Sequence, residues 1–186
     1  MLRPELEGVS KFLSYLLRHH PETLKLKMDK QGWVKMDELI EKINTTRVDK
    51  VTLDMILEVV RDNNKQRFAI RENNWGMFIR ANQGHTLKDV DMKFKPVMPP
   101  EILYHGTGQK FVKSILEKGI LAGKRQHVHL SSDIETAINV GSRHGNPKVF
   151  EVNSKQMNSD GVEFYLSENR VWLTNFVDKK YIRVIK

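Results

Sequence analysis

The sequence predicts an α+β protein made of two small lobes. Apolar residues recur at helical spacing in the first half, short runs of strand-forming residues dominate the second half, and a proline-rich segment lies between them. Residues 91–100 contain three prolines, which preclude regular structure there. We therefore expect one lobe over residues 1–90, a linker over 91–100 and a second lobe over 101–186.

The first lobe is predicted to contain a helix, a short strand, two more helices and a hairpin. The first helix ends before Pro21, because the proline ring disfavours helical geometry in the preceding residue. We expect Asp37 to cap the second helix and Thr52 to begin the third. This order is that of a winged helix, a module that binds nucleic acid or another protein. The expected elements are a helix at 9–18, a turn at 29–32, a strand at 33–36, helices at 37–43 and from 52, and hairpin strands at 67–70 and 75–79.

The second lobe is predicted to be β-rich, with two helices. A helix over residues 111–118 ends at Gly119. Ser132 and Glu135 form the pattern of a capping box before a helix that runs through Val140. The expected strands lie at residues 102–105, 127–130, 149–152, 171–173 and 181–184.

Composition excludes several classes of protein. Hydrophobic residues make up 39% of the 186, enough for a core, yet no apolar run approaches the roughly 18 residues of a membrane-spanning helix. Residues 1–5 lack the apolar segment of a secretory signal, so we expect a cytoplasmic protein without a membrane partner. The absence of cysteine excludes disulfides and thiol catalysis. A net charge of +8 favours a nucleic acid as partner.

Arginine and histidine carry the predicted chemistry. Arg18 and His19 end the first helix, Arg67 lies later in the first lobe, and Arg125 lies in the second. Arginine binds phosphate through two parallel hydrogen bonds and keeps its charge, while histidine titrates near neutral pH. The pattern therefore favours a phosphate site to which both lobes contribute. The alternative for Arg18 and His19 is a pair of solvated cations that favour the helix dipole.

Three further motifs allow two interpretations each. His127 and His129 share one face of a predicted strand, but with no third ligand at the usual spacing we expect no metal, and instead a histidine that bonds a ligand or packs. Residues 104–107 (Tyr-His-Gly-Thr) are either a nucleotide cradle or a plain turn. Residues 82–85 (Asn-Gln-Gly-His) are a substrate-contacting loop or a turn. The glycine-rich fingerprints of Rossmann folds and phosphate loops are both absent.

Six ordered motifs together resemble the RNA 2′-phosphotransferase family, whose members remove a 2′-phosphate from RNA with NAD. The resemblance spans nearly the whole chain, and the set is far more specific than any one motif. The motifs lie at residues 10–19, 66–68, 79–85, 104–107, 125–131 and 171–174.

This resemblance implies a fold, a site and a reaction. It implies an N-terminal winged-helix lobe that binds the RNA phosphate and a C-terminal ADP-ribosyltransferase-like lobe that binds NAD. The RNA 2′-phosphate attacks the nicotinamide ribose and leaves ADP-ribosylated RNA. The ribose O2″ then attacks phosphorus, giving 2′-OH RNA and ADP-ribose 1″,2″-cyclic phosphate, with no metal required. The implied catalytic residues are Arg18, His19, Arg67 and Arg125, and the implied NAD-binding residues are His105, Gly106, Thr107, His129 and Ser131.

Several alternatives stay open. Glu168 lies near the position of the catalytic glutamate of many protein-modifying ADP-ribosyltransferases, and we expect it to be non-catalytic. His19 either protonates the departing RNA oxygen or only hydrogen-bonds the phosphate. The RNA is a tRNA splice junction, or a repair or capping substrate, and we expect a monomer. The rival functions are an ADP-ribosyltransferase that caps terminal phosphates of nucleic acids, and a non-catalytic winged-helix RNA-binding module.

Overall fold

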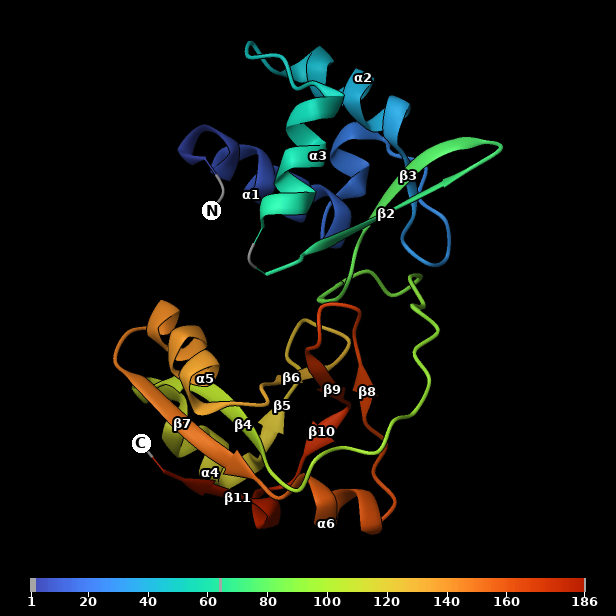
Figure 1. The fold of residues 1–186 in the computed structure, drawn as a ribbon. Coiled ribbons are helices and arrows are strands. Elements are labelled where there is room, and N and C mark those ends of the chain that lie inside the picture. Colours follow the sequence, from blue (N-terminus) through green and yellow to red (C-terminus); the bar gives the residue numbers. More distant parts are fainter. Residues whose placement is uncertain (1–2, 64, 186) are drawn as a thin grey trace. The chain divides into compact units, whose positions relative to one another are not determined.

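The computed structural model describes residues 3–63 and 65–185 and divides into two compact units, Met1–Lys93 and Phe94–Lys186. Within the described residues it contains six α-helices and antiparallel sheets of two or three strands, which confirms the α+β class (Figure 1). Residues 1–2, at the start of the N-terminus predicted to lack a signal, lie outside the described residues. No helix in the described ranges is long and apolar enough to cross a membrane.

The first unit packs three helices against a three-stranded sheet of order β1-β3-β2. The apolar residues of α1 recur every three or four positions, so they form one buried face, and Leu13 and Leu17 are fully enclosed in it. The β2–β3 ladder runs from the pair Phe68–Ala81 to the pair Asn73–Gly76 at its closed end. The elements are α1 (Pro4–Arg18), η1 (Pro21–Leu24), β1 (Val34–Lys35), α2 (Met36–Thr46), α3 (Leu53–Asp62), β2 (Phe68–Asn73) and β3 (Gly76–Ala81).

Most predicted elements of this unit are confirmed, with one correction. α1 ends at Arg18 as predicted, although it begins earlier, since Pro4 is tolerated in the first turn. The Thr52 hydroxyl caps α3 and accepts from the Met55 amide at 3.3 Å. The prediction that Asp37 caps α2 is wrong: Lys35 is the N-cap, and Asp37 lies within the first turn, where its charge favours the helix dipole.

The second unit contains two three-stranded sheets, β11-β7-β4 and β6-β9-β8, and the pair β10-β5. Phe150 and Phe164 are fully buried in its core. The strands are β4 (Leu103–Gly108), β5 (Ile120–Leu121), β6 (Val128–Leu130), β7 (Pro147–Val152), β8 (Tyr165–Leu166), β9 (Trp172–Thr174), β10 (Phe176–Val177) and β11 (Ile182–Val184). The helices are α4 (Val112–Lys118), α5 (Ile134–Gly141) and α6 (Ser154–Ser159), with 3-10 turns η2 (Gln109–Phe111), η3 (Ser142–His144) and η4 (Lys179–Tyr181).

The helix ends of this unit confirm one prediction and correct another. α4 ends at Gly119, whose φ of +80° suits glycine. The prediction of a capping box from Ser132 and Glu135 is wrong by one residue, because the N-cap is Asp133, whose carboxylate accepts from the Thr136 amide at 2.7 Å. α6 and the short strands β5, β8 and β10 were not predicted, since two-residue strands carry almost no periodic signal.

Candidate active site

The end of α1 holds Arg18 and His19 beside the segment that follows the hairpin. The Thr86 amide donates to the Arg18 carbonyl at 3.0 Å, and His19 Nδ1 lies 3.2 Å from Thr86 Oγ1. Pro21 begins a 3-10 turn two residues after His19, so α1 stops there. Thr86 therefore orients the imidazole through Nδ1, and proton transfer by His19 would use Nε2.

Arg67, just before β2, is held by two buried polar side chains. Its Nη1 donates to Asn63 Oδ1 at 3.2 Å and lies 3.5 Å from Ser10 Oγ. Asn63 Nδ2 in turn donates to Ser10 Oγ at 3.0 Å, and the two residues are only 5% and 2% exposed. Both partners are neutral, so these contacts position the guanidinium without cancelling its charge.

His85 is buried in the same unit, and its pKa is lowered by its surroundings. Burial, together with the positive charges of Arg18 and Arg80, lowers the pKa of His85 from 6.5 to about 4. The positive charges of the two arginines, unlike the burial itself, favour a bound anion here. Residues 82–85 are therefore more than an exposed turn: His85 is enclosed, and the Asn82 side chain donates to the Gln66 carbonyl at 2.7 Å.

In the second unit, an antiparallel bridge joins β4 to the end of β6. The Tyr104 amide donates to the Ser131 carbonyl at 2.9 Å, and the Ser131 amide donates back at 2.8 Å. This bridge brings His105 Nδ1 to within 3.2 Å of the His129 carbonyl oxygen. Arg125, in the turn before β6, places Nη1 2.8 Å from His129 Nδ1. Two sequence motifs far apart in the chain thus meet within one unit.

These contacts fix the proton on each histidine. Arginine only donates, so Nδ1 of His129 accepts and its proton is on Nε2. A carbonyl only accepts, so Nδ1 of His105 carries the proton and its Nε2 is an acceptor. Burial lowers the pKa of His105 and keeps it neutral. The pair therefore carries one donor and one acceptor, a combination that a hydroxyl or an amide satisfies.

Arg125 lies in surroundings that disfavour its charge. Loss of hydration, and to a smaller extent the neighbouring charge of Arg143, lowers the pKa of the Arg125 guanidinium, which stays protonated at neutral pH. A bound anion would relieve both effects.

Gly106 and Thr107 contact α5. A Cβ at Gly106 would lie 1.7 Å from the Ala137 carbonyl oxygen, so only glycine allows the helix to pack this closely. Thr107 is 5% exposed, and a Cβ at Gly141 would lie 2.8 Å from its carbonyl oxygen. The close approach that the glycine permits here is that of a helix, and a role for these two residues in NAD binding stays a prediction.

Two other predicted groups lie elsewhere in the second unit. His127 packs edge-on against Phe94 and Tyr165, with ring centroids 6.1 and 5.6 Å away, so it is a packed histidine. Glu168 is exposed in the turn between β8 and β9. Among residues 3–63 and 65–185, no group of three His, Asp or Glu side chains could hold a metal ion.

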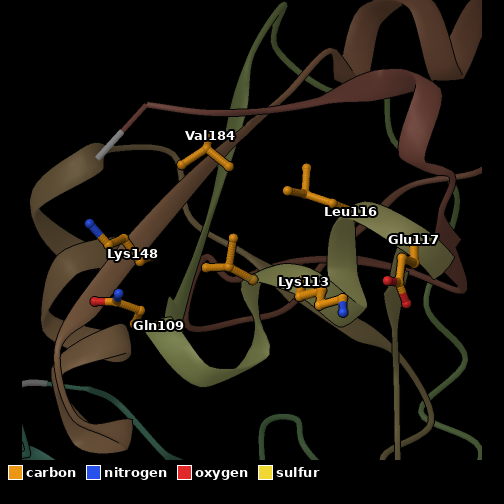
Figure 2. A pocket seen from close by; sticks show the side chains of 7 residues that line it. Gln109, Lys113, Leu116, Glu117, Lys148 and Val184 are labelled. Atoms are coloured by element: carbon orange, nitrogen blue, oxygen red, sulfur yellow. The ribbon is translucent and has the colours of Figure 1, made fainter.

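A shallow hollow of about 540 Å³ lies between α4 and the β7–β11 edge of the sheet. Figure 2 shows its mixed lining of apolar and charged side chains. Its described lining contains none of the predicted site residues: it consists of Gln109, Val112, Lys113, Leu116, Glu117, Lys148 and Val184.

Sequence reasoning missed the residues that hold the site in place. Ser10 lies on the apolar face of α1 and is buried there. A hydroxyl among the apolar positions of a helix was the available sign of a buried hydrogen bond. Asn63 and Thr86 were not predicted, because Asn63 depends on Ser10, which lies 53 residues away, and Thr86 bonds His19, which lies 67 residues away.

Comparisons with known proteins identify the family of the chain. The model of the RNA 2′-phosphotransferase, Tpt1/KptA family, matches residues 4–176. A protein of Acaryochloris marina is 48% identical over 177 residues, covering 95% of this chain and 96% of its own. One from Hahella chejuensis is 44% identical over 181 residues, covering 97% and 95%. One from Flavobacterium johnsoniae is 48% identical over 176 residues, covering 95% and 94%. Each is named a probable RNA 2′-phosphotransferase, and the chain therefore belongs to the RNA 2′-phosphotransferase family.

Proposed function

We propose that this protein transfers an internal 2′-phosphate of RNA, such as that of a tRNA splice junction, to NAD. The family match and the names of the relatives support the phosphotransferase activity. The observation that carries the proposal is the pre-positioned pair in the first unit: Arg67 held by Asn63, and His19 held by Thr86. In this proposal the first unit acts as a winged-helix lobe for RNA, and the second as an ADP-ribosyltransferase-like lobe for NAD.

The first step needs positioning more than a general base. An oxygen of the 2′-phosphate attacks C1″ of the nicotinamide ribose, and nicotinamide leaves with the electrons of the broken C1″–N bond. A phosphate anion is already a competent nucleophile, so the residues need only hold it in place. Arg18 and Arg67 suit this task, because a guanidinium binds two phosphate oxygens at once. Glu168 has no role in this step.

The second step moves the phosphoryl group. The ribose O2″ loses a proton and attacks phosphorus, the bond between phosphorus and the RNA O2′ breaks, and O2′ gains a proton. The products are 2′-OH RNA and ADP-ribose 1″,2″-cyclic phosphate. Arg18, Arg67 and Arg125 stabilise the charge that develops on the phosphoryl oxygens. His19 either donates the proton to O2′ from Nε2 or hydrogen-bonds the phosphate, and an imidazole titrates in the range that permits the first role.

The second unit supplies groups for the NAD ribose and carboxamide. The Nε2 proton of His129 and the Nε2 lone pair of His105 are a donor and an acceptor of fixed identity. The family resemblance adds Gly106, Thr107 and Ser131 to the residues proposed to bind NAD. The reaction requires neither a metal nor a second copy of the chain.

The test is turnover of an oligoribonucleotide with one internal 2′-phosphate, with and without NAD and with no added metal. NAD-dependent appearance of nicotinamide and ADP-ribose cyclic phosphate is the expected result. Arg67→Gln should lower the rate at least 100-fold, because the loss of one such electrostatic contact costs about 3 kcal/mol or more. Arg61→Gln is the matched control, because Arg61 is exposed on α3 and pairs with its neighbour Asp62 at 2.7 Å. Intact RNA after incubation with NAD would contradict the proposal.

His19→Ala separates the two steps. If His19 is the acid of the second step, ADP-ribosylated RNA accumulates while nicotinamide release stays near the wild-type rate. If both steps slow equally, His19 is a phosphate ligand instead. Wild-type protein that stops at ADP-ribosylated RNA would indicate the capping activity and not the phosphotransferase.

A further inference from the structure

We propose that the outer face of the β1-β3-β2 sheet binds single-stranded RNA, and that Trp75 at the hairpin tip stacks on a base several nucleotides from the reacting phosphate. We call this surface the wing face, and it consists of Trp33, Lys35, Arg71, Trp75, Phe78 and Arg80. The inference rests on the proposed function only in taking RNA as the partner.

Trp75 is exposed yet held in an ordered turn. Its side chain is 81% exposed, which is unusual for so large an apolar group. Its amide donates to Asn73 Oδ1 at 2.9 Å, and Gly76 turns the chain with a φ of +114°. Figure 1 shows the closed end of the β2–β3 hairpin extending beyond the helices of its unit. An indole presented in this way adds little to the stability of the unit and is available to a partner.

The strand register places cations beside aromatic rings on one face. Arg71 and Lys35 are both paired with Phe78 across the sheet, so the three side chains share the outer face. The pair Ile70–Ile79 points to the opposite face, where Ile79 is fully buried. The packing of the core therefore does not require the cationic and aromatic side chains of the outer face.

Ring and cation contacts hold the wing face together. The guanidinium carbons of Arg71 and Arg80 each lie 4.5 Å from the centroid of Trp33. Arg71 also pairs with Asp29 at 3.4 Å, which offsets part of the positive charge. The stem of Lys35 lies along the hairpin end, since a Cβ at Gly76 would come within 3.4 Å of its Cε.

This combination is that of a single-stranded nucleic-acid platform. Such platforms pair backbone-binding cations with aromatic rings on which bases stack, and each stacked base contributes about 1–3 kcal/mol. An exposed tryptophan alone would also suit a protein partner. Three cations on the same face, in a chain of net charge +8, favour a polyanion.

The length of the hairpin sets how far the contact lies from the phosphate. Six residues of extended chain separate Arg67 from Asn73, about 20 Å at roughly 3.3 Å per residue. A stacked strand rises by roughly 3.4 Å per nucleotide, so this span corresponds to about six nucleotides. A base on Trp75 therefore belongs to RNA well outside the phosphorylated nucleotide.

The experiment measures RNA affinity by fluorescence anisotropy at low salt, without NAD and with oligoribonucleotides that carry no 2′-phosphate. Trp75→Ala should weaken binding of an oligonucleotide of about 12 residues by about 5- to 150-fold, the equivalent of one stacked base. Trp75→Phe should keep most of the affinity, because it keeps a ring. Val48→Ala is the matched control, since Val48 is 97% exposed in the α2–α3 loop.

Salt dependence tests the cations separately. Lys35→Gln and Arg71→Gln should each reduce the slope of log affinity against log salt by about one, while Trp75→Ala leaves the slope unchanged. Urea midpoints equal to that of the wild type show that the variants fold.

Two results would overturn the proposal: no loss of affinity with Trp75→Ala on the oligonucleotide of about 12 residues, or no measurable RNA binding by the wild type at low salt. Because the assay contains neither NAD nor 2′-phosphate, its failure leaves the proposed reaction intact. Absent turnover with an intact Trp75 effect would contradict the proposed reaction alone.

Discussion

The buried His85 should make the first unit acid-sensitive. Its pKa is about 4 in the folded protein and near 6.5 in an unfolded chain. Between these values the unfolded chain binds more protons than the folded protein does. The free energy of unfolding therefore rises with pH over this range, and the contribution of His85 to stability is lost as the pH falls below 6.5. A difference of 2.5 pKa units corresponds to about 3 kcal/mol in total, of which about 2 kcal/mol is lost by pH 5.

The assay is urea unfolding from pH 7.5 to 5, followed by tryptophan emission in a Trp172→Phe background. Trp33 and Trp75 then report on the first unit alone, which matters because burial also lowers the pKa of His105 in the second. His85→Gln cannot titrate, so its free energy of unfolding should fall by about 2 kcal/mol less than that of the parent over this range. Equal pH dependence in parent and variant would refute the reasoning, whatever the variant does to stability at pH 7.5.

Two further predictions concern packing and positioning. Gly106→Ala places a Cβ 1.7 Å from the Ala137 carbonyl oxygen, and we expect the second unit to lose about 3 kcal/mol of its free energy of unfolding, followed by Trp172 emission in a background without Trp33 and Trp75. Gly8→Ala, with nothing within 4 Å, should raise the stability of the first unit by about 0.5–1 kcal/mol. Asn63→Ala removes an acceptor of the Arg67 guanidinium, and we expect kcat/KM to fall about tenfold. In an Arg67→Ala background the same change should have no further effect, and a second tenfold loss would show that Asn63 acts in another way.

Local signals predicted the elements that local chemistry determines. Pro21 set the end of α1, Thr52 set the start of α3, and Gly119 set the end of α4, because each effect acts within one helical turn. Asp37 and Ser132 were misassigned as caps because several polar residues crowd each helix start, and the fold decides which one takes the extended backbone of an N-cap.

The candidate site residues were chosen from the sequence by their charge, whereas the side chains that hold them could not be predicted. Arginine and histidine at a helix end stand out in a sequence, since they are costly to bury and chemically specific. Ser10 and Asn63 are ordinary residue types, and only the tertiary fold brings them together under Arg67. Gly106 shows what a glycine in the sequence leaves open. A glycine beside a candidate ligand-binding residue indicates that another group approaches the backbone closely, but the sequence does not say whether that group is a ligand or, as the structure shows, α5.

In both units a neutral side chain accepts a hydrogen bond from a candidate-site arginine. Arg67 donates to an amide oxygen of Asn63, and Arg125 donates to a ring nitrogen of neutral His129. A carboxylate in either place would bind the guanidinium more strongly, but it would also cancel the charge and compete with a phosphate. These neutral acceptors orient each guanidinium without placing a negative charge beside it, and burial lowers the pKa of Arg125. The proposed reaction requires this compromise, because in it the same arginines must stay charged and oriented through both steps.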